Sequence, residues 1–223
     1  MKRKEKILYI IEQLNLLYPE AHCSLTYTKP YELLIATRLS AQCTDERVNK
    51  VTPVLFKKYD TLEKLASADF DDICQIIHSC GFYRGKAKSI IEMSNTILKE
   101  YNGKVPDTIE QLVTLSGVGR KTANLIVGDV YGKPAIIADT HCIRLSNRLG
   151  LANSENPVIV EKQLKDIIPP EHQTKFCHNL VHHGRAVCMA RSPKCGECTL
   201  NIVCPYSKQQ LKKINSQKTA NKK

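Results

Sequence analysis

The sequence lacks any apolar run that approaches the roughly 20 residues a membrane-spanning helix needs, so we expect no contact with a membrane. The basic N-terminus, MKRKEKILYIIEQL, lacks a small-residue cleavage site and repeats its apolar residues at helical spacing, which excludes a signal peptide. Strand signals are scarce, and the best of them, Pro134–Ala138, is short. These absences predict an intracellular chain built from helices.

The sequence does contain many apolar residues at helical spacing. Apolar residues recur at three- and four-residue intervals in segments 7–17, 48–55, 73–77 and 87–98. Prolines, including Pro53, are expected between helices, where helices start or stop. With 223 residues and 42% hydrophobic content, the chain can form one large domain or two small ones. The fold class is therefore predicted as all-α, with about ten short helices.

Acidic residues are outnumbered by basic ones. The chain has 33 Lys and Arg against 22 Asp and Glu, a net charge of +11. Six lysines follow Pro205 with no acidic residue among them, which predicts a disordered basic tail. This excess of positive charge favours a nucleic-acid partner, although a merely soluble basic protein could have the same charge.

Residues 112–124, LVTLSGVGRKTAN, predict two helices joined by a glycine turn. Gly117 and Gly119 flank Val118 in this turn, and the second helix begins at Arg120. Turn N–H groups and a helix N-terminus together form a cradle for an anion, for which a phosphodiester is the natural guest. The segment is a helix-hairpin-helix, unless it is a plain corner between two helices.

Two residues near this hairpin could carry chemistry. Lys121 is expected in the first turn of the second helix, where the helix dipole and Arg120 both disfavour a protonated amine and so favour a nucleophile. Asp139 follows a buried apolar run and precedes a helix. It is predicted to cap that helix, and a carboxylate in that position can also face a developing cation.

Four cysteines near the C-terminus follow the pattern C-x6-C-x2-C-x5-C, within CMARSPKCGECTLNIVC. Four thiolates this close can bind either zinc or an iron–sulfur cluster. Zinc sites typically use two short knuckles, whereas here the outer spacings are wide, so the spacing favours a [4Fe–4S] cluster. Zinc, and four unliganded thiols, remain the alternatives. The four are Cys188, Cys195, Cys198 and Cys204.

These motifs, together with LLIATRLSAQCTD at 33–45, GFYRGKA at 81–87, ADTHCIRLSNR at 138–148 and HGR at 183–185, resemble those of the endonuclease III family in their order. The likeness extends from about residue 5 to 206. The family comprises bifunctional DNA glycosylases and AP lyases of the helix-hairpin-helix/Gly-Pro-Asp superfamily. The resemblance implies a six-helix barrel module over 23–133, and a cluster module from 1–22 and 134–206 with its loop at 188–204. It places the active-site cleft between the modules and leaves 207–223 as the tail.

The resemblance also implies roles for single residues. Lys121 matches the Schiff-base nucleophile and Asp139 the catalytic aspartate, while Gln42 fills the space of an extruded base and Phe82 is the wedge against the opposite strand. The four cysteines match the ligands of a [4Fe–4S] cluster. Further DNA contacts are expected from Gly117, Val118, Gly119, Arg120, His141, Arg191 and Lys194. The sequence departs from the family pattern at Cys43, Ser116 and Ser192, and Leu is frequent at the position of Phe82.

The implied function is base excision repair: removal of oxidised pyrimidines, then cleavage of the abasic site by β-elimination. The expected partner is double-stranded DNA containing damaged bases or abasic sites. We expect a monomer that acts where the DNA is, in the cytoplasm or nucleoid if the source is bacterial. One alternative is the adenine-removing mismatch glycosylase of the same superfamily, which generally lacks the hairpin lysine. The other is a non-catalytic iron–sulfur or zinc DNA-binding module, which leaves the combination of Lys121 and Asp139 unexplained.

Overall fold

Helices account for all the regular structure that the described residues contain. The structure is a computed structural model that describes residues 2–220, with side chains to residue 212. It confirms the all-α prediction, because no strand is formed within this range. No helix in the same range is both long and apolar enough to cross a membrane.

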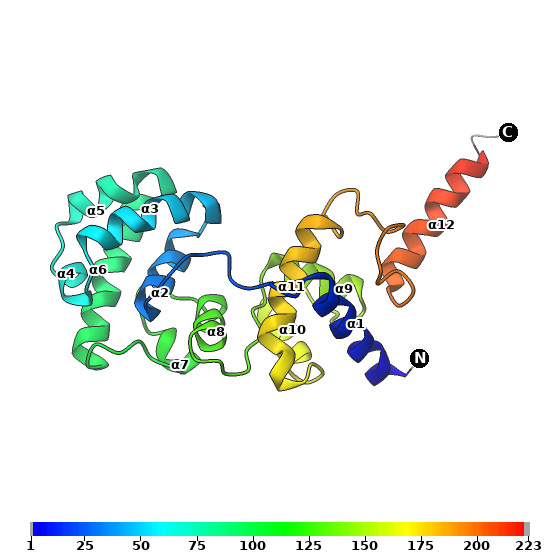
Figure 1. Cartoon of the computed structure of the whole chain (residues 1–223), viewed down its shortest axis with the longest axis horizontal. Coiled ribbons are helices and arrows are strands. Elements are labelled where there is room, and N and C mark those ends of the chain that lie inside the picture. The colour runs from blue at the N-terminus through cyan, green and yellow to red at the C-terminus, as the bar shows by residue number, and fades with distance from the viewer. Residues whose placement is uncertain (1, 221–223) are drawn as a thin grey trace. The chain divides into compact units, whose positions relative to one another are not determined.

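The chain divides into two compact units (Figure 1). Cys23–Lys133 form one unit, called here the central unit. Met1–His22 and Pro134–Lys223 form the other, called the discontinuous unit because its two parts are far apart in sequence.

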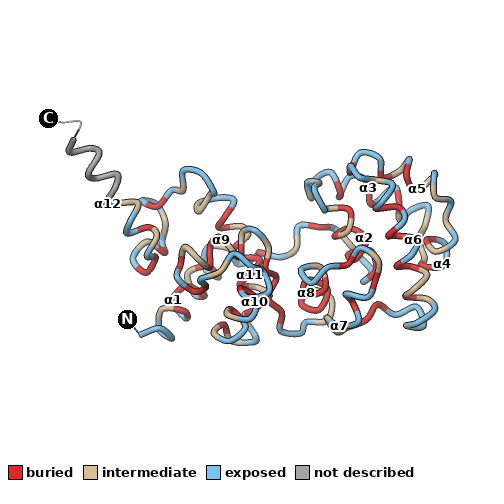
Figure 2. The backbone as a smooth tube through the Cα atoms, turned by 180° about the vertical axis from the view of Figure 1, so that it is seen from behind, coloured by how far each residue is buried: buried red, intermediate tan, exposed pale blue. Residues whose placement is uncertain are grey.

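The central unit is organised around α6 (Tyr83–Glu100), which contacts α2, α4 and α5 (Figure 1). Its inner face carries Ala87, Ile90, Met93 and Ile97, all buried at helical spacing (Figure 2). This burial explains why the periodicity of segment 87–98 predicted a helix correctly. The remaining elements are α2 (Pro30–Leu39), α3 (Asp45–Lys58), α4 (Leu62–Ala66), α5 (Phe70–Ile77), η1 (His78–Cys80), α7 (Ile109–Leu112) and α8 (Arg120–Asp129).

Pro53 lies inside α3 and does not separate two helices, contrary to the prediction. A proline in a helix interior costs about 3 kcal/mol, because it removes one hydrogen bond and its ring meets the preceding turn. Burial offsets this cost. Val48, Val51, Thr52 and Leu55 are buried on one side of α3, and each apolar side chain contributes about 1.5–3 kcal/mol.

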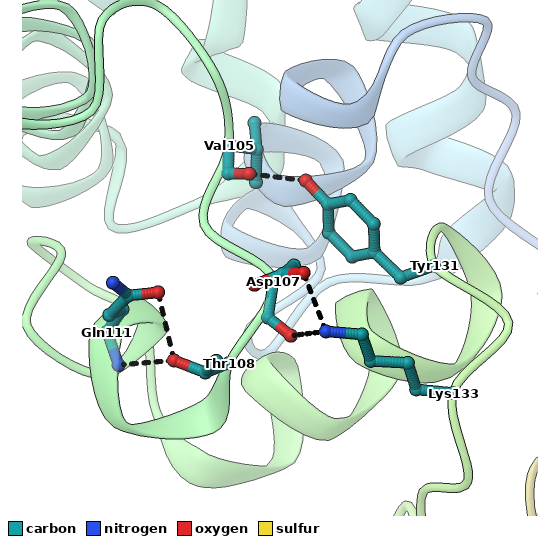
Figure 3. A network of polar contacts seen from close by, with 6 residues as sticks. All are labelled: Val105, Asp107, Thr108, Gln111, Tyr131 and Lys133. Carbon is teal, nitrogen blue, oxygen red and sulfur yellow. Dashed lines mark hydrogen bonds and ion pairs between the residues drawn. The ribbon is translucent and has the colours of Figure 1, made fainter.

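Polar contacts bracket the α7–α8 hairpin at both of its ends (Figure 3). Nζ of Lys133, after α8, donates to a carboxylate oxygen of Asp107, before α7, at 2.6 Å. The Tyr131 hydroxyl donates to the carbonyl of Val105. Thr108 caps α7 by accepting a hydrogen bond from the backbone N–H of Gln111. The entrance and exit of the hairpin are thereby tied together.

In the discontinuous unit, α1 (Arg3–Leu17) packs against α11 (Gln173–Ala186), and α11 packs against α9 (Thr140–Arg148) (Figure 1). Buried residues of α1, such as Ile10 and Leu14, and of α11, such as Phe176 and Leu180, supply the core. The unit also contains α10 (Pro157–Lys165), η2 (Pro170–His172) and α12 (Pro205–Ala220).

Residues 134–138, where the sequence has its best strand signal, form no strand, in agreement with the all-α prediction. Four of them are buried, and the N–H of Ile137 donates to Sγ of Cys177 at 3.2 Å. The tail predicted to be disordered from residue 207 is helical in α12 up to Ala220. Proline at the first helical position, followed by lysine, glutamine and leucine without glycine, favours this helix. The predicted tail also includes residues 221–223, which lie outside the described range.

Candidate functional site

The glycine turn between α7 and α8 is packed tightly on its inner side. Gly117 has φ +76°, and a Cβ placed on it would come 2.5 Å from Nε of Arg38 and 2.8 Å from Oγ of Ser89. Val118 is buried, whereas Gly117 and Gly119 are exposed. The turn therefore packs against side chains of α2 and α6, while both of its glycines remain exposed to solvent.

Gly119 is the N-cap residue of α8, and it supplies no side-chain hydrogen bond to the helix. The first N–H groups of a helix have no partner within the helix, so a glycine cap leaves them for an outside acceptor. Lys121 lies in this first turn and is exposed. The positive end of the helix dipole and the Lys121 amine are thus available together to an anionic ligand.

Asp139 caps α9, as predicted. Its Oδ1 accepts a hydrogen bond from the backbone N–H of Cys142 at 2.7 Å, and its backbone is extended. His141, in the first turn of the same helix, has Nδ1 3.1 Å from a guanidinium nitrogen of Arg144. The buried segment 134–138 and the cap together hold the Asp139 carboxylate at the start of the helix.

Gln42 and Phe82 lie together, as their predicted roles require. Both line one open pocket of about 1000 Å³ in the central unit, together with Arg38 and Arg84. Both also adopt left-handed backbone conformations, with φ 55° at Gln42 and φ 48° at Phe82. Phe82 is 73% exposed. A left-handed backbone at a residue other than glycine is strained, and it persists only where the surrounding structure holds it.

The four predicted ligands Cys188, Cys195, Cys198 and Cys204 line a single pocket of about 360 Å³ in the discontinuous unit. Cys195 and Cys204 are buried. Within the described residues, no group of three or more His, Cys, Asp or Glu side chains converges closely enough to hold one metal ion. Burial raises the pKa of the Cys198 thiol to about 11. A metal centre would therefore have to supply the positive charge that keeps this sulfur a thiolate.

Arg148 organises the loop that carries the first of these cysteines. Its guanidinium donates to Sγ of Cys188 at 3.2 Å and to the carbonyls of Met189 and Ala190 at 2.8 and 3.0 Å. It also stacks on the ring of Tyr206, 4.3 Å from the centroid. One side chain of α9 therefore fixes both ends of the cysteine loop.

His183 connects Cys198 to α1. Burial lowers the pKa of His183 to about 4, so the ring is neutral at pH 7. Its Nε2 lies 3.4 Å from Sγ of Cys198, and its Nδ1 lies 3.1 Å from the Tyr18 hydroxyl. A neutral imidazole has one donor and one acceptor, so an Nε2–H donating to a thiolate leaves Nδ1 to accept from Tyr18.

Sequence reasoning assigned no role to Arg38, Arg148 or Tyr18, and it noted His183 only as part of a motif. Arg148 is one of two arginines that the sequence places on the helix after Asp139, but its contacts with the cysteine loop and Tyr206 depend on the fold. The exposed side chains of Arg191 and Lys194 lie in the loop between Cys188 and Cys195. Ser192 has φ 51° there, a left-handed conformation that turns the loop.

Comparison with known proteins decides the family. A family profile described as "HhH-GPD superfamily base excision DNA repair protein" matches residues 35–170. The chain is 48% identical to endonuclease III of Synechocystis sp. over 91% of this chain and 93% of that protein. The chain belongs to the endonuclease III family. It is a base excision repair DNA glycosylase with AP lyase activity.

A second endonuclease III and a solved structure support the same family. Endonuclease III of Escherichia coli K12 is 37% identical over 92% of this chain and 98% of its own length. A solved structure described as a trapped endonuclease III–DNA covalent intermediate has a TM-score of 0.88 and 42% identity, covering 95% of this chain and all of that one. These similarities favour endonuclease III over the adenine-removing glycosylase and over a non-catalytic module.

Proposed function

We propose that this member of the endonuclease III family removes oxidised pyrimidines from double-stranded DNA and then cuts the strand through a Schiff base on Lys121. The observation that carries the proposal is the exposed Lys121 in the first turn of α8, next to a glycine cap that leaves helix N–H groups for a phosphate. The relative described as a trapped covalent intermediate with DNA supports an enzyme nucleophile.

In the proposed binding step, the hairpin holds the DNA backbone and the damaged nucleotide leaves the stack. Gly117, Val118, Gly119 and Arg120 contact phosphates, which positions the duplex without reading its sequence. Extruding a base costs a few kcal/mol, which Gln42 and Phe82 offset by filling the vacated space. Their shared pocket and exposed side chains support this role.

In the proposed chemical step, the amine of Lys121 attacks C1′ of the sugar and the damaged base leaves. The carboxylate of Asp139 stabilises positive charge that develops on the sugar and accepts the proton that Lys121 loses. The C1′–O4′ bond of the sugar ring then opens, with a proton passing to O4′, which leaves the nitrogen of Lys121 in a Schiff base with C1′. The Schiff base acidifies the C2′ proton, a base removes that proton, and β-elimination breaks the C3′–O bond so that the 3′ phosphate leaves. Reversal of the Schiff base with water returns Lys121 to its amine form.

We also propose that Cys188, Cys195, Cys198 and Cys204 hold a [4Fe–4S] cluster. The residues fit such a group, because all four cysteines line one pocket and the sulfurs of Cys188, Cys198 and Cys204 are contacted by Arg148, His183 and the backbone N–H of Ser207, respectively. When bound, the cluster supplies a rigid cross-link for the loop carrying Arg191 and Lys194. These two exposed cations then contact phosphates, as does His141. On this proposal the protein acts where the cell keeps its DNA.

Borohydride trapping on duplex DNA with one oxidised pyrimidine tests the proposal. Reduction of a Schiff base leaves a covalent protein–DNA adduct, which we expect on the damaged duplex but not on an undamaged one. The adenine-removing glycosylase and a non-catalytic module would leave no adduct on this substrate. Excision without an adduct would show that water, and not an amine, displaces the base.

A further inference from the structure

Lys86 is the largest fully buried side chain that carries a charge. Its relative exposure is 1%, and its ammonium donates to three backbone carbonyls: Leu39 at 2.8 Å, Ala41 at 2.8 Å and Cys80 at 2.9 Å. An ammonium has three N–H donors, so every one of them is used. A buried lysine is tolerated only when it is satisfied in this way.

The three carbonyls belong to two separate segments. Leu39 is the last residue of α2 and Ala41 lies in the loop that follows it, whereas Cys80 is the last residue of η1. The negative end of the α2 dipole favours the ammonium there. Lys86 itself lies in the first turn of α6, where the dipole disfavours a cation. Stability alone does not explain a lysine in this position, since an apolar side chain of similar size would avoid both desolvation and the unfavourable dipole.

Each segment continues directly into one of the strained residues of the pocket. Gln42 follows Ala41, and Phe82 follows Cys80 after Gly81. Both have positive φ without being glycine, which costs roughly 1–2 kcal/mol at each position. Their conformations persist only if the surrounding backbone is held, and Lys86 is the side chain that bonds to both of these backbone segments.

We infer that Lys86 is a positioning residue for base extrusion: by joining the two turns, it presents Gln42 and Phe82 to the DNA as one unit. The inference rests on the proposed function, because that proposal assigns these two side chains to the gap in the duplex. Lys86 does not touch the DNA. Its contribution is to remove the freedom of the two turns before the substrate binds.

The test replaces Lys86 with methionine, an unbranched apolar side chain one heavy atom shorter, which removes all three donors. The matched control is Lys88→Met, two residues further along the same helix, where the lysine is exposed and pairs with Glu92 at 3.7 Å. The readout is the fluorescence of 2-aminopurine placed opposite a stable abasic analogue, which rises when the base loses its stacking. Melting temperatures of both variants accompany each measurement.

We expect Lys86→Met to reduce the fluorescence rise and to slow excision from duplex DNA by on the order of tenfold to a hundredfold. Borohydride trapping on a preformed abasic site in single-stranded DNA should be unchanged, because that substrate needs no extrusion. In a variant that already carries Gln42→Ala and Phe82→Ala, adding Lys86→Met should cause little further loss of excision. Lys88→Met should resemble the wild type throughout.

Two results would overturn the inference: a wild-type fluorescence rise in Lys86→Met, or a full additional loss in the variant lacking both side chains. If Lys86→Met does not fold, Lys86→Gln, which retains an amide donor, goes through the same measurements. A lowered melting temperature with wild-type base opening would make Lys86 purely structural. Absence of any adduct with the wild-type protein would instead contradict the proposed function.

Discussion

Arg38 and Gly117 lie so close that no side chain fits on the glycine: an added Cβ would come 2.5 Å from Nε of Arg38, at φ +76°. Gly117→Ala should therefore lower the stability of the protein by more than the roughly 1–2 kcal/mol that a positive φ costs alone. It should also weaken binding to duplex DNA, because the hairpin turn must shift away from Arg38. Thermal unfolding and equilibrium binding measure the two effects.

Gly132→Ala is the control for that prediction. Gly132 has φ +62°, but an added Cβ would meet no atom within 4 Å. This variant should show the backbone cost without the collision and should bind DNA like the wild type. Equal losses of stability and of DNA binding in the two variants would mean that the Arg38 side chain moves aside at little cost.

Lys121→Gln should abolish strand cleavage and borohydride trapping, because the amide cannot form a Schiff base. Binding to duplex DNA should survive, since the turn backbone and the glycine cap are unchanged. Lys162→Gln, at an exposed lysine of α10, is the control and should trap normally. Adduct formation by Lys121→Gln would assign the chemistry to another amine.

Asp139→Asn should separate the capping of α9 by this residue from its proposed part in catalysis. Asparagine caps a helix as well as aspartate does, so stability should stay near that of the wild type. Turnover should fall about a hundredfold or more because the negative charge is lost. Asp139→Ala should lose a further ~1 kcal/mol of stability with the cap. Near-normal turnover in Asp139→Asn would leave Asp139 only its structural function.

Purified protein should contain about four iron and four sulfide per chain, as a cubane cluster requires. Cys198→Ser should lower this content and weaken DNA binding, because the loop with Arg191 and Lys194 loses its anchor. Cys23→Ser, at a cysteine outside the 188–204 loop, should leave the iron content unchanged. About one zinc per chain without sulfide would contradict the cluster and favour a zinc site.

Deleting residues 212–223 should weaken binding to damaged and undamaged duplex alike and flatten its dependence on salt. The deletion removes five lysines and no acidic residue, so fewer counterions are released on binding. It spares Tyr206 and Ser207, which contact Arg148 and Cys204. Single-turnover cleavage at saturating enzyme should not change. A salt series for both proteins checks this, and an identical slope would show that the tail does not meet the DNA.

The structural features that the sequence predicted correctly depend on residues that are close together in the chain. Apolar spacing predicted the helices, and the cap at Asp139 followed from neighbouring residues. The prediction for Pro53 failed because packing outweighs local preference there: the buried face of α3 accommodates this proline. The contacts of Lys86 join residues 45 and 47 positions away, and those of Tyr18 reach 165 positions, so no local pattern indicates them.

Because the discontinuous unit is built from two segments far apart in sequence, it cannot fold until both have been synthesised. Helix α1 is synthesised before the central unit, whereas its partner α11 is synthesised after it; the Asn15 and Asn179 side chains, for example, meet at 2.7 Å. The central unit is complete once Lys133 has emerged and can fold as translation proceeds. Until α11 has also been made, α1 lacks the helix that covers Ile10 and Leu14, so this interval leaves the nascent chain open to aggregation.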